Sequence, residues 1–135
     1  MRVLIDTNVV LDFLLEREPF VEAAADLFER IDDGQIQAFI TATTITNIYY
    51  IIRKASGSAV ARNAVEQILT DLDVCPVERS TLQLAIGFNF RDFEDAVQYA
   101  CALASQVDVI VTRNASDFTT SQISVVSPEE LKKIL

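Results

Sequence analysis

Histidine is absent from the chain of 135 residues, and its absence excludes several kinds of chemistry. Neither a Ser-His-Asp nor a Cys-His nucleophile can be built without an imidazole. A zinc site of the HExxH kind is excluded for the same reason. Any acid–base catalysis must therefore fall to carboxylates, a metal-activated water, or a Lys, Tyr or Cys side chain.

Glycine, proline and cysteine are scarce, with three, three and two residues. So few glycines and prolines predict short connections and much helix. Because Cys75 and Cys101 lie in apolar or mixed runs, we expect free, buried thiols rather than a disulfide. No apolar run approaches the roughly 18 residues of a membrane helix, and Asp6 comes too early for a signal peptide. These absences favour a cytoplasmic protein that does not contact a membrane.

Half of the residues are hydrophobic and 23% are charged, which predicts one folded domain over residues 1–135. The net charge of −9 argues against generic nucleic-acid binding, because the phosphate backbone attracts Lys and Arg. The segment 34–65 is an exception, because it contains no acid and three bases, Arg53, Lys54 and Arg62. These bases are candidates for an RNA-binding surface, and a chance gap in the acidic sequence explains them about as well.

The spacing of apolar residues predicts strands that alternate with helices. Short apolar runs indicate strands at residues 3–5, 36–40, 74–77, 108–112 and 123–126. Amphipathic spacing indicates helices at residues 7–15, 19–32, 43–55, 59–72, 79–88 and 93–106, and Ser127-Pro128-Glu129-Glu130 is a capping box that opens a last short helix. This order predicts an α/β fold with a central, mostly parallel sheet of four or five strands. Ligands of such sheets bind beyond the carboxyl ends of the strands.

Acidic residues occupy the positions where such ligands bind. Asp6 directly follows the first strand, Asp117 lies just past the fourth, and Asp92 and Asp95 begin the helix between them. Each acid taken alone is explained as a helix cap or a turn residue. However, two carboxylates about 5 Å apart repel by about 3 kcal/mol at an effective dielectric near 20. Such a group must stay protonated, pair with a base such as Arg113, or hold a cation, and a hard divalent ion prefers oxygen ligands of this type.

Three segments resemble the PIN-domain nucleases in their order and spacing: Leu4-Ile5-Asp6-Thr7-Asn8, Asp92-Phe93-Glu94-Asp95-Ala96, and Val111-Thr112-Arg113-Asn114 with Asp117-Phe118. That family includes the toxin halves of bacterial VapBC-type toxin–antitoxin pairs, and the resemblance runs from residue 2 to the final helix. It implies a three-layer α/β/α fold with an acidic pocket that binds Mg²⁺ or Mn²⁺ and cleaves RNA phosphodiester bonds. It also implies a homodimer that is silenced by a small antitoxin.

The resemblance assigns roles to particular residues. Asp6, Asp95 and Asp117 match the family's catalytic, metal-binding acids, and the supporting polar residues are Thr7, Asn8, Thr44, Asn47, Arg113 and Asn114. One position departs from the family, because Asn47 stands where PIN domains usually carry a Glu. An amide oxygen can bind a hard cation but brings no charge, so Glu94 or Asp92 is expected to restore the missing carboxylate.

We therefore predict a metal-dependent endoribonuclease, the toxin of a toxin–antitoxin pair. A divalent cation can activate water for attack on phosphorus without any histidine. One alternative is a PIN-fold module that binds RNA or protein and has lost catalysis at Asn47. A phosphoryl-accepting receiver or phosphatase is a weaker alternative, because Asn8 stands where the phosphatase needs a second acid and Arg113 where the receiver needs a Lys.

Overall fold

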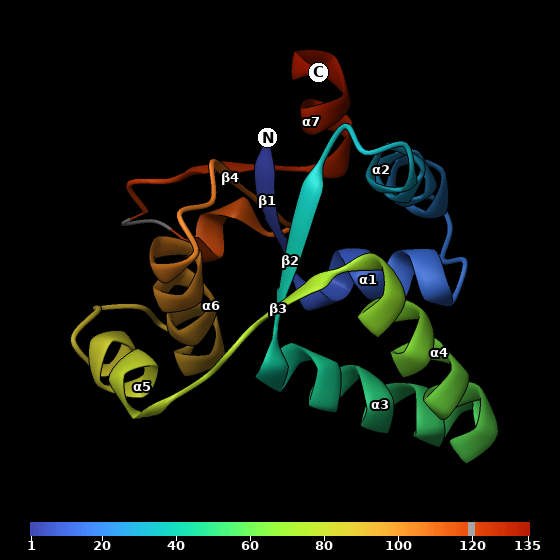
Figure 1. Ribbon diagram of the computed structural model, residues 1–135, viewed down its shortest axis with the longest axis horizontal. Coiled ribbons are helices and arrows are strands. Elements are labelled where there is room, and N and C mark those ends of the chain that lie inside the picture. Colours follow the sequence, from blue (N-terminus) through green and yellow to red (C-terminus); the bar gives the residue numbers. More distant parts are fainter. Residues whose placement is uncertain (119–120) are drawn as a thin grey trace.

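The computed structural model describes residues 1–118 and 121–135, and its centre is a sheet of five strands (Figure 1). The strands are β1 (Arg2–Ile5), β2 (Gln37–Thr41), β3 (Asp73–Cys75), β4 (Val109–Val111) and β5 (Ser124–Val126). Their order across the sheet is β3-β2-β1-β4-β5, and each neighbouring pair is parallel. The mostly parallel sheet expected from the sequence is confirmed, with β1 at its centre.

Alternate residues of the central strands pack into two separate cores. Val3 and Ile5 of β1 belong to one apolar cluster, whereas Leu4 belongs to the other, and all three are fully buried. Helices therefore cover both faces of the sheet, because a parallel strand without polar alternation must be buried on both sides. The predicted three-layer α/β/α architecture is confirmed.

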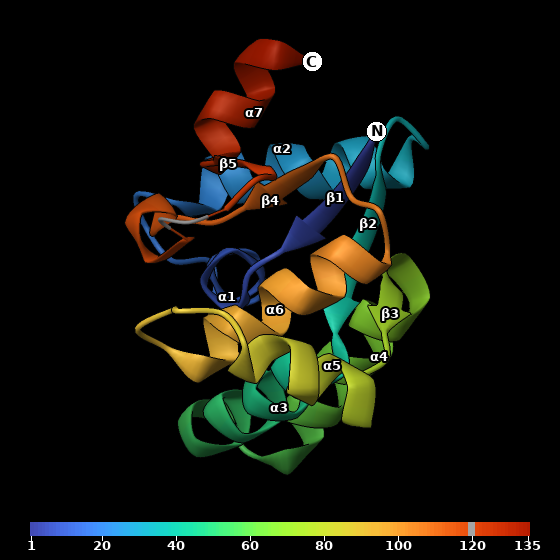
Figure 2. The ribbon, with the colours of Figure 1, turned by 90° about the vertical axis from the view of Figure 1, so that its left-hand side faces the viewer.

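The two helical layers are unequal (Figure 1, Figure 2). The larger layer contains α1 (Thr7–Leu14), α2 (Val21–Asp32), α3 (Ala42–Ser56), α4 (Ser58–Asp71) and α7 (Pro128–Ile134). The smaller layer contains α5 (Arg79–Ile86), α6 (Phe93–Ala104) and the short 3₁₀ helix η1 (Ala115–Phe118). Among the described residues, no helix is long and apolar enough to cross a membrane.

The predicted elements all form, and their ends follow local chemistry. Gly57, at φ +92°, separates α3 from α4 where the Ser-Gly-Ser sequence predicted a break. Ser127 caps α7 by accepting a hydrogen bond from the Glu130 backbone N–H, as its capping box predicted. The helix predicted from residue 19 begins at Val21 instead, and Pro19 lies in the turn before it. Both cysteines are free and buried, as expected.

The carboxyl ends of β1 and β4 lie side by side, because these strands pair in register from Val3 with Val109 to Ile5 with Val111. Asp6 continues β1, and its backbone N–H donates to the Val111 carbonyl at 2.9 Å. Thr112 continues β4 at the same edge of the sheet. The fold thus brings together two polar residues that are separated by more than a hundred positions in the chain.

Candidate active site

A cavity of about 670 Å³ opens at this edge of the sheet. Its walls come from the start of α1, one face of α3, the start of α6 and the loop after β4. The acidic residues in the wall are Asp6, Asp92, Glu94, Asp95 and Asp117. Two arginines, Arg17 and Arg113, also line it. The acids singled out in the sequence therefore share one cavity.

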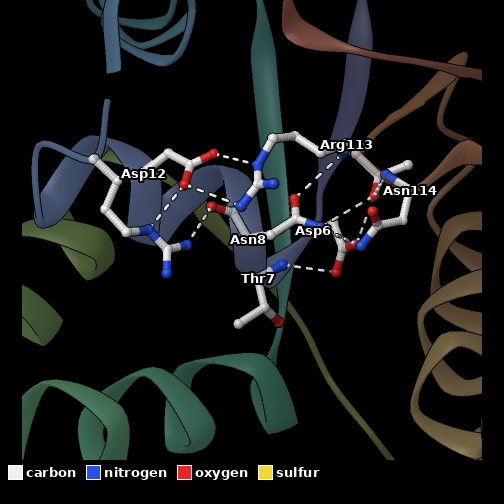
Figure 3. A network of polar contacts seen from close by, with 8 residues as sticks. Asp6, Thr7, Asn8, Asp12, Arg113 and Asn114 are labelled. Atoms are coloured by element: carbon white, nitrogen blue, oxygen red, sulfur yellow. Dashed lines mark hydrogen bonds and ion pairs between the residues drawn. The ribbon is translucent and has the colours of Figure 1, made fainter. Parts of the chain in front are cut away.

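Asp6 is 7% exposed, and its carboxylate is held entirely by neutral donors. Oδ1 accepts from the Thr7 backbone N–H at 2.7 Å and from Gln98 Nε2 at 2.9 Å. Oδ2 accepts from Thr112 Oγ1 at 2.7 Å and from Asn8 Nδ2 at 3.4 Å (Figure 3). Asp6 thus caps α1, but no described cation neutralises its charge. A buried carboxylate that is hydrogen-bonded yet unpaired favours the approach of a cation from the cavity.

Gln98, which is 1% exposed, holds Asp6 through its amide nitrogen and leaves its own oxygen without a partner. Oε1 of Gln98 is the one buried side-chain polar atom, among the described residues, that makes no hydrogen bond. Such an orphan acceptor is costly unless a ligand or water satisfies it. Gln98 is itself one of the lining residues, so its amide holds Asp6 from within the wall of the cavity.

Asp95 and Asp92 lie at the start of α6. Asp92 caps the helix by accepting from the Asp95 backbone N–H at 3.1 Å. Burial raises the pKa of the Asp95 carboxyl from 3.8 to about 7, and the negative charges of Asp6, Asp92, Asp117 and Glu94 raise it in the same direction. The carboxylates are therefore close enough to repel one another, and ionising all of them together requires a compensating cation.

Asn47 contacts one of these acids directly. Its Nδ2 donates to Glu94 Oε1 at 2.9 Å, and both side chains line the cavity. Asn47, on α3, therefore fixes a carboxylate that comes from α6. Glu94 brings a negative charge to the α3 side of the cavity, where Asn47 alone would bring none.

The second buried carboxylate of α1, Asp12, is organised in the opposite way. Asp12 is 1% exposed, and its oxygens accept from Arg17 Nε at 2.9 Å and from Arg113 Nε and Nη2 at 2.6 and 3.3 Å (Figure 3). Arg17 also donates from Nη2 to the Asn8 carbonyl. The Arg113 guanidinium lies 3.9 Å from the ring centroid of Phe20, a cation–π contact. Asp12 is thus neutralised where Asp6 is not.

The structure places the other predicted residues at different distances from this cavity. Asp117 is exposed in η1 and lines the cavity, as do Thr7, Asn8 and Asn114. Thr44 does not line it; it is buried and hydrogen-bonded to Thr41 at 2.8 Å. Arg53 and Lys54 are exposed in the last turn of α3, and Arg62 is exposed on α4 beside a different, smaller cavity. The structure therefore does not bring these three bases together with the acids.

The sequence reasoning missed four residues that organise the site: Asp12, Arg17, Gln98 and Thr112. Gln98 lies three positions after Asp95, so helical periodicity places both on one side of α6. Thr112 ends β4 beside Asp6, which strand pairing places next to it. The Asp12–Arg17–Arg113 network joins α1 to the loops after α1 and β4. No local sequence pattern predicts it.

The donor chemistry of the cavity fits a hard divalent cation. The groups are carboxylate and amide oxygens, which Mg²⁺ and Mn²⁺ prefer, together with the unsatisfied Gln98 oxygen. In the part of the chain that the structure describes, no three Asp, Glu, Cys or His side chains are gathered closely enough to share one ion. The acids surround the cavity rather than forming a closed cage.

Residues 2–116 match the family described as PIN domain. The chain belongs to the PIN domain family. A curated relative, Ribonuclease VapC1 of Aquifex aeolicus (strain VF5), is 24% identical over 134 residues and covers 96% of this chain and 92% of its own length. The match to the family, over residues 2–116, includes every residue that lines the cavity except Asp117.

Several solved structures have the same fold, although the sequences of these proteins have low identity to this chain. A toxin–antitoxin complex from Klebsiella pneumoniae has a TM-score of 0.70 at 20% identity, and covers 93% of this chain and 97% of its own. VapC20 of Mycobacterium tuberculosis, described as a sarcin-ricin loop cleaving toxin, has a TM-score of 0.71 at 13% identity, and covers 90% of this chain and 95% of its own. These likenesses establish the PIN fold over nearly the whole chain.

Proposed function

We propose that this PIN domain is a divalent-metal-dependent endoribonuclease, the toxin of a toxin–antitoxin pair. The observation that carries the proposal is the buried Asp6 carboxylate, which faces four further acids in one cavity and has only neutral hydrogen-bond donors. A cation bound among these acids would relieve the repulsion between them and stabilise the fold. The names of the relatives, a VapC ribonuclease and an RNA-cleaving toxin, support RNA as the substrate.

Asp6, Asp95 and Asp117 are the residues that would hold Mg²⁺ or Mn²⁺, with Glu94 or Asp92 supplying a further carboxylate. When bound, such an ion would supply Lewis-acid stabilisation of the phosphoryl oxygens and a lowered pKa of bound water. The chain orients its own ligands. Thr112 and Gln98 fix the Asp6 carboxylate from opposite sides, and Asn47 fixes Glu94.

The proposed partners follow from the structural relatives, several of which are toxin–antitoxin complexes. A small antitoxin would silence the enzyme by covering the acidic cavity. Tyr50 and Ile51 of α3 line its rim and are 58% and 42% exposed, so they offer apolar contact area beside the acids. A homodimer, which the family resemblance implies, belongs to the same proposal.

The experiment is cleavage of labelled structured and unstructured RNAs with Mn²⁺, with Mg²⁺ and with EDTA, beside the Asp6→Asn variant. We expect cleavage that requires metal and is lost in the variant. Metal-independent cleavage, or cleavage at the wild-type rate in both Asp6→Asn and Asp95→Asn, contradicts the proposal.

The second candidate, a PIN-fold module that binds RNA or protein without cutting, is favoured by Asn47 alone. Calorimetry with Mn²⁺ separates the two functions. A nuclease binds the ion through Asp6 and loses that binding in Asp6→Asn. The non-catalytic module gives little or no heat in either protein.

A further inference from the structure

Two guanidinium groups stand in the wall of a cavity that is otherwise acidic. Among its lining residues, Arg17 and Arg113 carry the positive charge, against the five acids named above. An RNA phosphodiester that approaches these acids is repelled by them, and the net charge of the chain is −9. The position of the two arginines therefore determines where a phosphate can come close to the metal-binding acids.

Both arginines are held by one carboxylate that is itself outside the cavity. Asp12 is 1% exposed and does not line the cavity. Its oxygens are occupied by Arg17 and Arg113 at 2.6 to 3.3 Å. One negative charge against two positive charges leaves the trio with a net charge of +1. Asp12 thus neutralises part of the charge and leaves the rest at the cavity wall.

The remaining contacts fix the direction of each guanidinium. Arg113 uses Nε and Nη2 on Asp12 and lies over the Phe20 ring. Arg17 uses Nε on Asp12 and Nη2 on the Asn8 carbonyl. Within residues 1–118 and 121–135, Nη1 of neither arginine has a hydrogen-bond partner. Each side chain therefore keeps donors for a ligand while most of its conformational freedom is already lost, and this reduces the entropic cost of binding.

We propose that Arg17 and Arg113 form a binding site for a phosphate of single-stranded RNA, and that Asp12 is the positioning residue that holds both guanidiniums there. The inference rests on the proposed function, since it takes RNA as the ligand. Guanidinium forks match phosphate oxygens in geometry and charge. A phosphate held there lies beside the acids, because Arg17 and Arg113 line the same cavity as Asp6.

The test measures RNA binding apart from cleavage. The probe is a short, fluorescein-labelled single-stranded RNA of mixed sequence, because a phosphate contact does not depend on sequence. Anisotropy in EDTA gives the affinity of wild type, Arg17→Gln and Arg113→Gln between about 50 and 200 mM salt. We expect each variant to bind about tenfold more weakly and to lower the slope of log affinity against log salt by about 0.7, the value for one lost single-strand phosphate contact.

Arg30→Gln is the matched control. Arg30 pairs with Asp26 at 2.9 Å on α2 and does not line the cavity, so the variant changes net charge equally. It should bind RNA as the wild type does. In Mn²⁺, the two test variants should raise the KM for cleavage about tenfold and change kcat by less than about threefold.

Asp12→Asn separates positioning from bulk charge. Removing one negative charge near the cavity should tighten RNA binding if charge alone matters. If Asp12 positions the arginines, binding weakens although the protein becomes less acidic. A thermal melt verifies folding, and if Asp12→Asn does not fold, Arg113→Lys serves instead, because it keeps the charge and loses the fork on Asp12.

The outcomes distinguish this inference from the function on which it rests. A wild type that neither binds nor cuts RNA overturns both. A wild type that binds or cuts RNA, with affinity and salt slope unchanged in Arg17→Gln and Arg113→Gln, overturns the phosphate site alone. Asp12→Asn that binds RNA more tightly than the wild type overturns the role of Asp12.

Discussion

Asp6 and Asp12 are buried carboxylates only six residues apart, yet their surroundings differ in kind. Asp12 has two guanidinium partners, whereas Asp6 has two side-chain amides, a hydroxyl and a backbone N–H. Removing one partner of a buried ion pair is costly, but a carboxylate among other acids destabilises the fold unless a cation joins it. The charge of Asp12 is therefore balanced by the protein's own arginines, whereas the charge of Asp6 remains available to a bound cation.

The largest expected effect is on activity at Asp6. Asp6→Asn keeps the shape of the side chain and removes its charge, so cleavage should fall about a thousandfold, as for loss of a preorganised electrostatic group. The melting temperature of the metal-free protein should change little, because the loss of one acid from a repelling cluster offsets the hydrogen bonds that the amide nitrogen of Asn cannot accept. Asp33→Asn, at the exposed C-terminal end of α2, makes the same charge change and should alter neither quantity. A large loss of stability in Asp6→Asn would show that the Asp6 charge stabilises the fold as the Asp12 charge does.

At Asp12 the effect falls on stability instead. Asp12→Asn breaks two ion pairs to a buried carboxylate, but the side chains of Arg17 and Arg113 are 38% and 27% exposed, so the pairs are partly screened. We therefore expect a loss of about 2 kcal/mol in the free energy of unfolding, or a melting temperature lower by about 8 °C. Asp26→Asn breaks the surface pair with Arg30 and should cost under about 1 kcal/mol. Equal losses in the two variants would mean that Asp12 is an ordinary surface pair.

The sequence allowed the role of Asp6 to be predicted, but not that of Asp12. Asp6 could be found because it follows a short apolar strand, and ligands of a parallel sheet bind beyond the carboxyl ends of the strands. Asp12 lies within a helix between Leu11 and Phe13, where a single acid signals nothing. Its partners come from the loop after α1 and from a segment a hundred residues away. Local pattern predicted the strands, the helices and the acids of the site. Long-range packing decided that Arg17 and Arg113 bind Asp12.

Substitution of Asn47 should have a smaller effect, on metal binding by the acids of the cavity. Asn47→Ala should weaken Mn²⁺ binding about tenfold, as loss of a residue that orients a ligand does, because Glu94 loses its donor at 2.9 Å. Calorimetry checks this. If Asn47 acts through Glu94, the double variant Asn47→Ala with Glu94→Gln should bind no more weakly than Glu94→Gln alone. Additive losses would show that Asn47 contacts the ion independently.

The pH dependence of stability tests the repulsion at Asp95. Its pKa is raised to about 7 in the folded protein and is near 3.8 when unfolded, so the folded state holds a proton that the unfolded state releases. The metal-free protein should therefore lose stability as pH rises from about 4 to about 7, by about 1 kcal/mol, since the half-buried carboxyl is partly screened. Mn²⁺ should reverse the loss, and Asp95→Asn should remove this part of the pH dependence. A metal-free stability that rises over this interval in the wild type alone would contradict the repulsion.

The smallest effects concern the bases that the sequence offered as RNA contacts. Asn47, Tyr50 and Ile51 line the cavity, and Lys54 continues their stripe one turn beyond, at the i, i+3, i+4, i+7 spacing of one helix face. Lys54→Gln should weaken RNA binding by about twofold, because an exposed charge within a Debye length of about 10 Å attracts the backbone without a fixed contact. Arg53 lies off this stripe and Arg62 beside another cavity, so Arg53→Gln and Arg62→Gln should match the Arg30→Gln control. A tenfold loss of RNA affinity in these two variants would show that RNA binds along α3 and α4 rather than at the arginines held by Asp12.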